Sequence, residues 1–302
     1  MKIRDVIPEY LTYLAAIDRS YYTIRGARYT LLSFVGYIES DQVYQVEDLT
    51  RSVIEDYQEE LAFSLTAKGK PLSVRTQIKR LGIVKGFTRY LQEQDYLVHD
   101  PSLKIKLPKE PRRLPRSILN PSEMKKLLDT PDLRTINGYR DRIILEILYD
   151  TAVRRSEIAG IKVHDIDLDA GFILIHGKGD KERVVPLSVH VCELVRNYML
   201  AVRPDYVKGK DTGWLFMNDK GQKIHVHTVW MIVKRNAKKA HIGKNITTHT
   251  FRHTCVTHML KNGAPIRHLQ EMLGHESLES TQIYTHVTIN DLKEVHAKYH
   301  PR

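Results

Sequence analysis

Side chains of the kinds that handle phosphate esters are spread through the second half of this chain. They comprise two guanidinium groups, one amine, two imidazoles and one phenol, on Arg154, Lys178, His249, Arg252, His275 and Tyr284. A guanidinium fork binds phosphate oxygens, an imidazole titrates near neutral pH, and a deprotonated phenol is a nucleophile. The set contains no acidic metal ligand. It predicts a phosphodiester that is attacked by a side-chain nucleophile without a metal ion or other cofactor.

Arg154 lies in a polar break between two apolar stretches. Residues 151–157 read TAVRRSE, and Ser156 and Glu157 are expected to start a new helix. An arginine in such a junction is expected to be partly buried, where its planar fork needs an anionic partner. Phosphate is one candidate for that partner, and Glu157 is the other.

Two lysines lie in a glycine-containing turn. Lys178 and Lys181 belong to the segment HGKGDKER, residues 176–183, where glycine lets the chain turn tightly and approach a ligand. A lysine at the tip of such a turn can contact phosphate or act as a general acid, although most basic turns are simply solvated. The Walker phosphate-loop pattern is absent from this segment.

His249 and Arg252 are predicted near the start of a helix, with Thr248 as its N-cap. The free N–H groups of a helix start attract anions, and residues three apart share one helix face. His249 and His253 also have the i, i+4 spacing of a zinc-binding helix, but position 250 is Thr and no nearby acid completes the set. We therefore predict a phosphate pocket and no metal site here.

The last two candidates follow another predicted helix. Pro265 is expected to start that helix and Gly274 to end it, which places His275 in the turn beyond. Tyr284 follows in the segment QIYTH, residues 282–286, on the next short helix. Its place behind the five cationic and imidazole side chains distinguishes Tyr284 among the 16 tyrosines of the chain.

Residues 1–100 are predicted to form a helical bundle. Apolar residues recur there at helical spacing in four stretches, and no period-two alternation competes. The apolar positions are Val6, Tyr10, Tyr13, Leu14 and Ile17; Leu31, Leu32, Val35 and Ile38; Val53, Tyr57 and Leu61; and Ile78, Leu81, Ile83, Val84, Phe87, Tyr90 and Leu91.

A proline-rich basic segment follows the bundle. Residues 101–116 carry four prolines, six basic residues and one acid, a composition that indicates an extended connection. The segment is either an ordinary solvated linker or a strap that follows a phosphate backbone. In the second case the DNA contacts are Lys104, Lys106, Lys109, Arg112, Arg113 and Arg116. We place the linker at residues 108–118, between domains at 1–107 and 119–302.

The second domain is predicted to mix helices with a small sheet. Asn120, Pro121 and Glu123 are typical of a helix start, and a long apolar helix is expected around residues 139–149. Residues 171–175 and 183–187 are predicted strands of a hairpin, with a further short strand at 214–217. Helix is expected elsewhere beyond residue 189. The predicted fold is mainly α, with a small antiparallel sheet in the second domain.

The composition of the chain indicates which class of partner it binds and in which cellular compartment it is expected. Lys and Arg number 47 against 36 acidic residues, and a net charge of +11 suits a polyanion such as nucleic acid. The two cysteines, Cys192 and Cys255, exclude a disulfide framework and a four-cysteine metal site. No apolar run reaches the ~18–20 residues that span a bilayer, and the first residues lack a signal-peptide core. We expect a cytoplasmic protein.

These motifs together resemble the tyrosine recombinases, or phage integrase family, and most closely their Xer type. The family pattern has an arginine in a T-G-L-R-x-S-E-like box, then G-K-G-x-K-x-R, H-x-L-R, L-G-H and I-Y-T-H. Residues 151–157, 177–183, 249–252, 273–275 and 283–286 match these boxes in order. Ala152 replaces the usual Gly and Phe251 the usual Leu, both at positions that we assign to packing.

The resemblance implies a fold and a set of partners. It implies a C-shaped clamp on double-stranded DNA, built from a helical core-binding (SAM-like) domain and a catalytic domain. Family members work as homo- or hetero-tetramers on two duplexes, in some cases with an accessory protein. The tail from residue 292 to 302 is similar to the short C-terminal helix of Xer proteins, which docks on a neighbouring subunit.

The resemblance also implies a mechanism. Tyr284 would attack a DNA phosphate and form a 3′-phosphotyrosyl link, while Arg154 and Arg252 bind the non-bridging oxygens. Lys178 would protonate the leaving 5′ oxygen, with Lys181 as the competing candidate, and Glu157 would orient Arg154. Either His249 or His275 would accept the proton of the phenol.

Several functions are compatible with such a site. A type IB topoisomerase uses nearly the same residues and relaxes supercoils, and a DNA-binding protein with a degenerate site would not cleave at all. Among recombinases, the candidates are chromosome or plasmid dimer resolution by a Xer-type enzyme and integration or excision of a mobile element. The hairpin, the L-G-H box and the Xer-like tail favour recombination.

Overall fold

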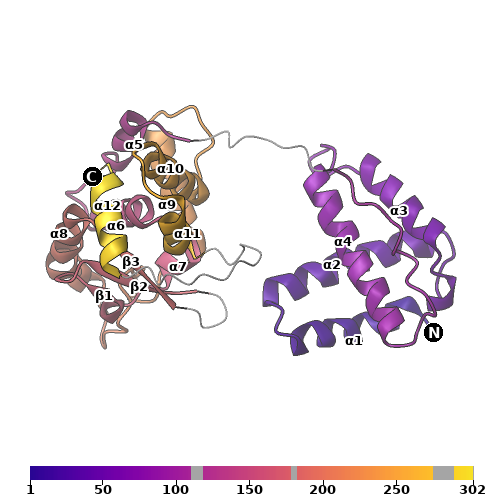
Figure 1. Cartoon of the computed structure of the whole chain (residues 1–302). Coiled ribbons are helices and arrows are strands. Elements are labelled where there is room, and N and C mark those ends of the chain that lie inside the picture. Colours follow the sequence, from indigo (N-terminus) through magenta and orange to yellow (C-terminus); the bar gives the residue numbers. More distant parts are fainter. Residues whose placement is uncertain (110–117, 178–181, 275–288, 302) are drawn as a thin grey trace. The chain divides into compact units, whose positions relative to one another are not determined.

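The computed structural model describes residues 1–109, 118–177, 182–274 and 289–301. The chain divides into two compact units, an N-terminal unit of residues 1–113 and a C-terminal unit of residues 114–302 (Figure 1). No helix among the described ranges is both long enough and apolar enough to cross a membrane. Each unit is described by itself below.

The N-terminal unit is helical, as predicted. It contains α1 (Ile3–Ala16), α2 (Tyr21–Ser40), η1 (Val46–Asp48), α3 (Arg51–Phe63) and α4 (Val74–Glu93). Ser20, Thr50 and Ser73 cap the starts of α2, α3 and α4 by accepting a backbone N–H three residues on. Phe34 and Tyr57 pack edge to face in the core, which the apolar stripes of the helices fill.

The chain that leaves α4 is held against that helix. Lys85 donates hydrogen bonds from Nζ to the carbonyl oxygens of Ser102 and Ile105, the second over 2.9 Å. The hydroxyl of Thr88 donates to the Ser102 hydroxyl over 2.8 Å, and the Ile105 side chain is buried. The residues up to 105 therefore belong to the N-terminal unit rather than to a free connection.

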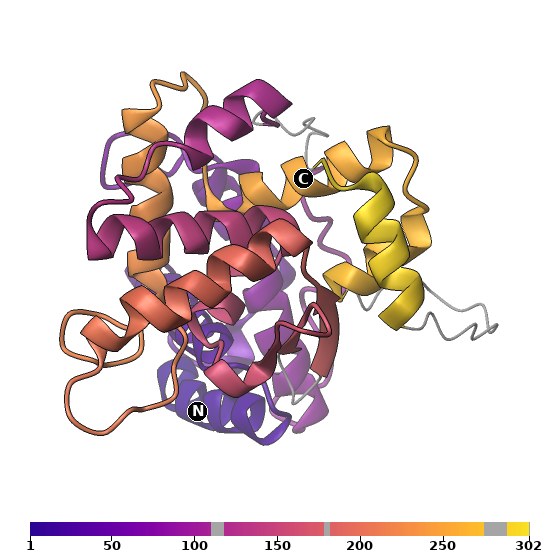
Figure 2. The same cartoon turned by 90° about the vertical axis from the view of Figure 1, so that its left-hand side faces the viewer.

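The C-terminal unit is built around one buried helix. It contains α5 (Pro121–Leu128), α6 (Ile136–Thr151), α7 (Arg155–Ala159), η2 (Val163–Asp165), α8 (Val189–Asn197), η3 (Tyr198–Val202), η4 (Arg203–Tyr206), α9 (Val226–Lys239), α10 (Thr248–Lys261), α11 (Ile266–Leu273) and α12 (Ile289–Tyr299). Residues 143–151 of α6 are all buried, because α8, α9 and α10 pack around that helix (Figures 1 and 2). The predicted capping residues at Asn120 and Glu123 bond reciprocally, with Pro121 as the first residue of α5.

The small sheet is antiparallel, in the order β1 (Ile166–Asp167), β2 (Phe172–His176) and β3 (Glu182–Pro186). The predicted hairpin is confirmed as β2 and β3, in a register that pairs Ile175 with Arg183. The strand predicted at residues 214–217 is wrong. Trp214 and Met217 form isolated bridges to Lys162 and Lys223, so that no continuous ladder develops.

Ala152 is fully buried in the hydrophobic core, in agreement with the packing role assigned to it. It is also the C-cap of α6 and has a left-handed backbone with φ of 52°. Glycine adopts this conformation without the steric cost that a Cβ adds. Phe251 is fully buried, in agreement with the packing role assigned to it.

Candidate active site

Glu157 is the centre of a charged cluster in the C-terminal unit. Its carboxylate accepts hydrogen bonds from Arg154 Nη1 over 2.9 Å and from the two Nη atoms of Arg183 over 3.0 and 2.7 Å. The backbone N–H of Arg154 donates to the same carboxylate over 2.7 Å, because Glu157 is the third residue of α7. The predicted pairing of Arg154 with Glu157 is thus present, and Arg183 joins it from β3.

The carboxylate of Glu157 is held in its charged form. Burial raises its pKa, but the guanidinium of Arg183, then the backbone N–H and guanidinium of Arg154, together lower that pKa to about 2. Only 5% of the Glu157 side chain is exposed. A pKa that falls from 4.5 to about 2 on folding corresponds to about 3 kcal/mol of stability at neutral pH.

Glu157→Gln is expected to lower the free energy of unfolding at pH 7 by about 3 kcal/mol. Because the folded pKa is depressed, the contribution is complete above about pH 4.5 and is lost as the pH falls toward 2. Urea unfolding of wild type and variant at a series of pH values should show the difference shrinking in that window. Glu193→Gln, an exposed position on α8, should match wild type throughout. A pH-independent difference would contradict the assigned charge.

Arg252 ties the ends of two helices together. It lies on α10, is 8% exposed, and donates from Nη1 to the carbonyl of Ala152 over 2.8 Å and from Nη2 to the carbonyl of Leu273 over 2.7 Å. These carbonyls belong to the ends of α6 and α11, where helices have no internal donors left. Burial, and then the charge of Arg154, lower the pKa of Arg252 to about 10, so it is a cation at neutral pH.

The cluster carries more positive than negative charge. Arg154, Arg183 and Arg252 influence one another, and Glu157 is the acid that acts on them. The side chain of Arg154 is 42% exposed and remains accessible to a ligand. A surplus of guanidinium charge around one buried carboxylate is suited to an anion with several oxygens, such as a phosphodiester.

Arg183 belongs to this cluster, although the sequence analysis does not predict it as a site residue. Besides its two bonds to Glu157, it donates from Nε to the carbonyl of Met272 over 3.0 Å and so holds the end of α11. The available signal is its place as the last residue of the G-K-G-x-K-x-R box. An arginine on a predicted strand has no local feature that distinguishes it from a solvated one.

His249 lies in the first turn of α10, as predicted, but the cap is one residue earlier than expected. Thr247 is the N-cap and accepts the N–H of Thr250, while Thr248 is the first helical residue. Burial, and then the charges of His253 and Arg252, lower the pKa of His249. A neutral imidazole beside the guanidinium cluster has a lone pair that can accept a proton.

Some of the remaining predicted site residues are described by the structure, and the others are not. Lys104, Lys106 and Lys109 are exposed on the N-terminal unit. The others lie outside the described residues: Lys178, Lys181, His275, Tyr284, Arg112, Arg113 and Arg116. Roles assigned to these seven stay predictions. Within the described ranges, one cluster has the spacing of metal ligands, and it consists of Asp150, His296 and His300 rather than His249 and His253.

Gly274→Ala is expected to destabilise the unit by about 1–2 kcal/mol, because Gly274 ends α11 with a left-handed φ of 60°. A Cβ there would lie 3.1 Å from Cδ and 3.3 Å from Nε of Arg183, whose guanidinium is already held by Glu157. Thermal unfolding should show a lower Tm for this variant. Gly243→Ala is the control, because its Cβ would meet no atom within 4 Å. Equal Tm values for the two variants would refute the expected strain of a Cβ at position 274.

Comparison with known proteins gives a consistent result. The sequence pattern of the phage integrase family matches residues 117–291. The chain is 36% identical to tyrosine recombinase XerD of Staphylococcus epidermidis over 302 residues, which cover 99% of this chain and 100% of that protein, and is equally similar to XerD of Staphylococcus aureus. A crystal structure of XerA recombinase aligns with a TM-score of 0.50 at 28% identity and covers 99% of both chains.

The fold is also similar to that of two recombinases whose structures were determined with bound DNA. The XerH site-specific recombinase bound to its difH substrate aligns with a TM-score of 0.70 at 19% identity, over 98% of this chain and 82% of that one. A lambda integrase dimer bound to a core site aligns with a TM-score of 0.69 at 16% identity, over 94% of this chain and 100% of that one. These two similarities concern the fold alone.

Proposed function

Since this chain belongs to the phage integrase family, it is a tyrosine recombinase that breaks and rejoins DNA at specific sites, and we propose that Tyr284 is its nucleophile. The observation that carries the proposal is the guanidinium cluster around Glu157. It provides a cationic site for one phosphate in the domain that also holds the I-Y-T-H box.

The proposed step is a transesterification. The phenolic oxygen of Tyr284 forms a bond to phosphorus, and the bond from phosphorus to the 5′ oxygen breaks. The reference pKa of a tyrosine phenol is about 10, so the attack requires a base, and we assign the proton of Tyr284 to His249 or His275. Lys178 donates a proton to the leaving 5′ oxygen, with Lys181 as the alternative. The products are a 3′-phosphotyrosyl link and a free 5′ hydroxyl.

The arginines stabilise the charge that develops on the phosphate. The exposed Arg154 donates to the non-bridging oxygens, and Glu157 orients it. The two carbonyl bonds of Arg252 use two of the five N–H donors of its guanidinium, and further donors are available to the phosphate. Fixed donors of this kind cost no reorganisation when charge develops.

The covalent link makes strand exchange possible without ATP or metal. One phosphoester replaces another, so the energy of the broken bond is roughly conserved. The 5′ hydroxyl of a second strand can then attack the phosphotyrosine and release Tyr284. Recombination and the reverse reaction use the same residues.

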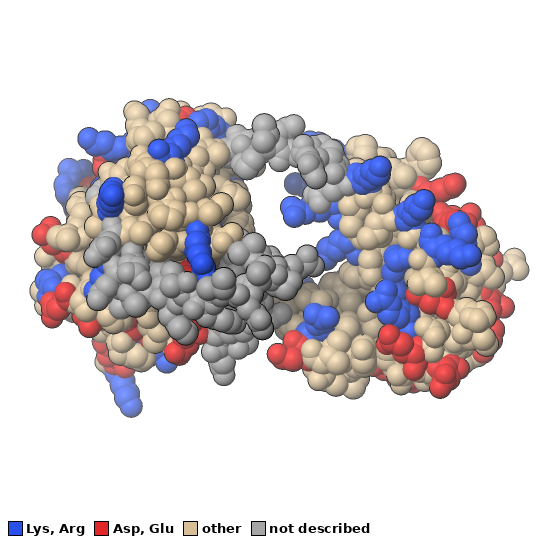
Figure 3. Space-filling view, in the orientation of Figure 1, with Lys and Arg blue, Asp and Glu red and all other residues tan. Residues whose placement is uncertain are grey.

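We propose that the basic helix α4 and the basic strap of the N-terminal unit contact the DNA backbone. Helix α4 carries five basic residues and one acid, whereas α3 carries one basic residue and four acids. Of the five, Lys85 is already bonded to the strap, so the DNA contacts proposed for this helix are the other four. Figure 3 shows Lys and Arg side chains over the α4 face of this unit. The strap adds Lys104, Lys106 and Lys109, and by sequence Arg112, Arg113 and Arg116. Phosphate contacts supply affinity that falls steeply with salt.

We propose further that the protein assembles as a tetramer on two duplexes. A lambda integrase tetramer on a Holliday junction has the same fold. The full-length similarity to XerD favours resolution of chromosome dimers over the movement of a mobile element. The comparisons give no support to the topoisomerase alternative.

A nicked suicide duplex tests the proposed function. The duplex carries a site selected from random DNA by binding to the full chain, and the nick lets a short fragment diffuse away after cleavage. We expect a covalent protein–DNA band, with equal yield in the presence of a chelator. A second assay on a plasmid with two such sites should produce exchanged circles. Relaxed plasmid without exchange would refute the proposal, as would loss of the covalent band in chelator at a temperature well below the Tm of the metal-free protein.

A further inference from the structure

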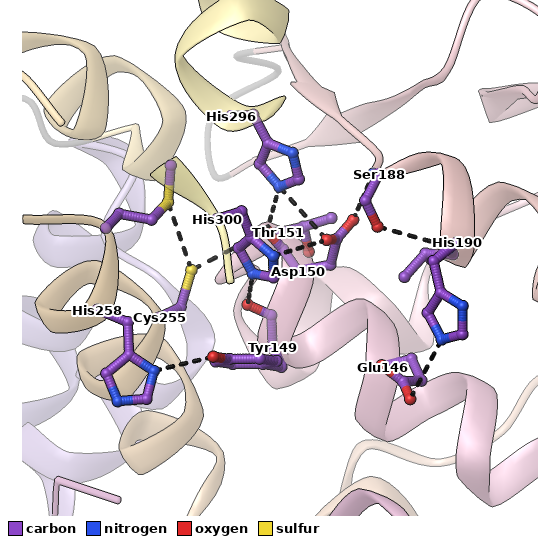
Figure 4. A network of polar contacts seen from close by, with 12 residues as sticks. Glu146, Tyr149, Asp150, Thr151, Ser188, His190, Cys255, His258, His296 and His300 are labelled. Carbon is purple, nitrogen blue, oxygen red and sulfur yellow. Dashed lines mark hydrogen bonds and ion pairs between the residues drawn. The ribbon is translucent and has the colours of Figure 1, made fainter. Parts of the chain in front are cut away.

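A buried polar cluster links α12 to the last turn of α6, apart from the guanidinium cluster. Asp150 comes from the last turn of α6, His296 from α12, and His300 from the residue after α12. Their exposed fractions are 0%, 2% and 6%. Figure 4 shows both imidazoles pointing at the carboxylate of Asp150.

The spacing of the three donor atoms matches metal coordination better than hydrogen bonding. Asp150 Oδ1 lies 3.4 Å from His296 Nε2 and 3.4 Å from His300 Nδ1, and all three atoms lie within 4.8 Å of one another. Hydrogen bonds from N–H to oxygen are about 2.7–3.2 Å long. Two ligands bonded to a tetrahedral zinc ion at about 2.0–2.2 Å are roughly 3.3–3.5 Å apart.

A backbone hydrogen bond fixes the orientation of the Asp150 carboxylate. Its Oδ2 accepts the backbone N–H of Ser188 over 2.8 Å, and this fixes the direction of Oδ1. Oδ1 is buried and accepts no hydrogen bond within the described ranges, although it faces both imidazoles. A buried carboxylate oxygen in this position has a strong requirement for a proton or a cation.

His300 has the outer contact typical of a metal ligand. His300 Nε2 lies 3.3 Å from the carbonyl of Tyr149, an acceptor that directs Nδ1 toward Asp150. The hydroxyl of Tyr149 in turn pairs with Nδ1 of the buried His258 over 2.8 Å. His296 faces Asp150 with Nε2, which also lies 2.8 Å from the backbone carbonyl of Asp150, so metal binding at Nε2 would remove its proton and break that hydrogen bond.

The donor set selects the kind of metal. Two imidazole nitrogens and one carboxylate oxygen suit zinc and its neighbours, whereas calcium and magnesium prefer oxygen alone. The nearby Cys255 is not among the three ligands, because its thiol is directed at Sδ of Met259, 3.8 Å away. Its Sγ lies 3.9 Å from the carbonyl of Asp150.

We propose that Asp150, His296 and His300 bind a divalent transition metal, zinc foremost, which fastens α12 to α6. The ion would bridge two elements that are 146 residues apart in sequence, from Asp150 to His296. Its role is structural and independent of Tyr284, so cleavage of a phosphodiester does not involve it. Without the ion, α12 keeps only its packing and its hydrogen bonds.

Zinc titration of the full, metal-free chain tests this site. Calorimetry should show one zinc ion per chain, with a Kd of roughly 1 μM or tighter, and a rise in Tm with zinc. Asp150→Asn and His300→Gln should each weaken binding by on the order of 100-fold or more, since even outer contacts of a metal site are worth 10–100-fold. His227→Asn, an exposed histidine of α9, should bind as wild type does.

The outcomes separate a metal site from a simple ion pair. Absence of stoichiometric zinc binding to wild type, or full binding by the Asp150→Asn, His300→Gln double variant, would overturn the proposal. If a variant does not fold, crystals of wild type grown with zinc give the answer: an anomalous peak bonded to the three side chains supports it, and a peak elsewhere refutes it. Covalent DNA cleavage in chelator reports separately on the proposed function.

Discussion

Tyr284→Phe is expected to abolish the covalent protein–DNA adduct and leave DNA binding unchanged. The substitution removes one oxygen atom, and that oxygen is the atom proposed to bond to phosphorus. Loss of the nucleophile of a covalent enzyme lowers the rate by on the order of 10⁴-fold or more. Denaturing gels of the suicide-duplex reaction should show no shifted band, and native gels should show the same affinity as wild type.

The matched control is another tyrosine of the same unit. Tyr139 is half-buried on α6, and Tyr139→Phe should form adduct at the wild-type rate. Adduct of undiminished yield from Tyr284→Phe would assign the nucleophile to a different residue. Peptide mapping of the wild-type adduct identifies the attached residue directly.

Arg252→Lys is expected to slow cleavage by about 10³–10⁵-fold, the range found when an arginine that stabilises phosphoryl transfer is removed. Lysine keeps the charge but has no planar fork, so it cannot bond the carbonyls of Ala152 and Leu273 together and also hold a phosphate. One buried carbonyl would lose its donor, at a cost of about 1–3 kcal/mol in stability. Single-turnover cleavage and urea unfolding should be measured on the same preparation.

Two comparisons separate chemistry from stability in this variant. Arg155→Lys changes an exposed arginine on α7 and should leave both measurements near wild type. Cleavage measured well below the Tm of Arg252→Lys excludes a deficit caused by unfolded protein. A cleavage rate within a few-fold of wild type would make Arg252 a purely structural residue.

The elements that sequence analysis predicted correctly depend on local signals. The start of α5 follows from Asn120, Pro121 and Glu123 within four residues, and the β2–β3 hairpin follows from β-type runs around a glycine turn. The end of α11 follows from Gly274. Each of these choices is made by residues adjacent in the chain, so a single sequence contains enough information.

The features that sequence analysis missed depend on distant contacts. Trp214 and Met217 find different partners on either side, so an apolar run that resembles a strand forms none. Arg183 acquires its role from Glu157, 26 residues away. Asp150 meets His296 and His300 only when α12 packs on β3, α10 and α11. No periodicity or spacing within a segment reports such pairings.

The candidate site was predicted in part: its residues are visible in the sequence, and some of their contacts are not. The boxes around Arg154 and Arg252 are recognisable from residue types and order, and the structure brings both side chains together with Glu157. The second function of Arg252, as a donor to two helix ends, is not visible in the box. A family pattern records which residues recur and does not separate their structural from their chemical contribution.

The bonds from Lys85 to Ser102 and Ile105 have a consequence for affinity. Because of these bonds, the connection between the units starts at about residue 106 and not at residue 94, the first residue after α4. When one half of a two-part binder is seated, the local concentration of the other half falls roughly as the −3/2 power of the joining length. The part-buried Lys85, together with Thr88 and the buried Ile105, therefore shortens the connection between the units. A shorter connection raises the avidity of the chain for a target that both units bind.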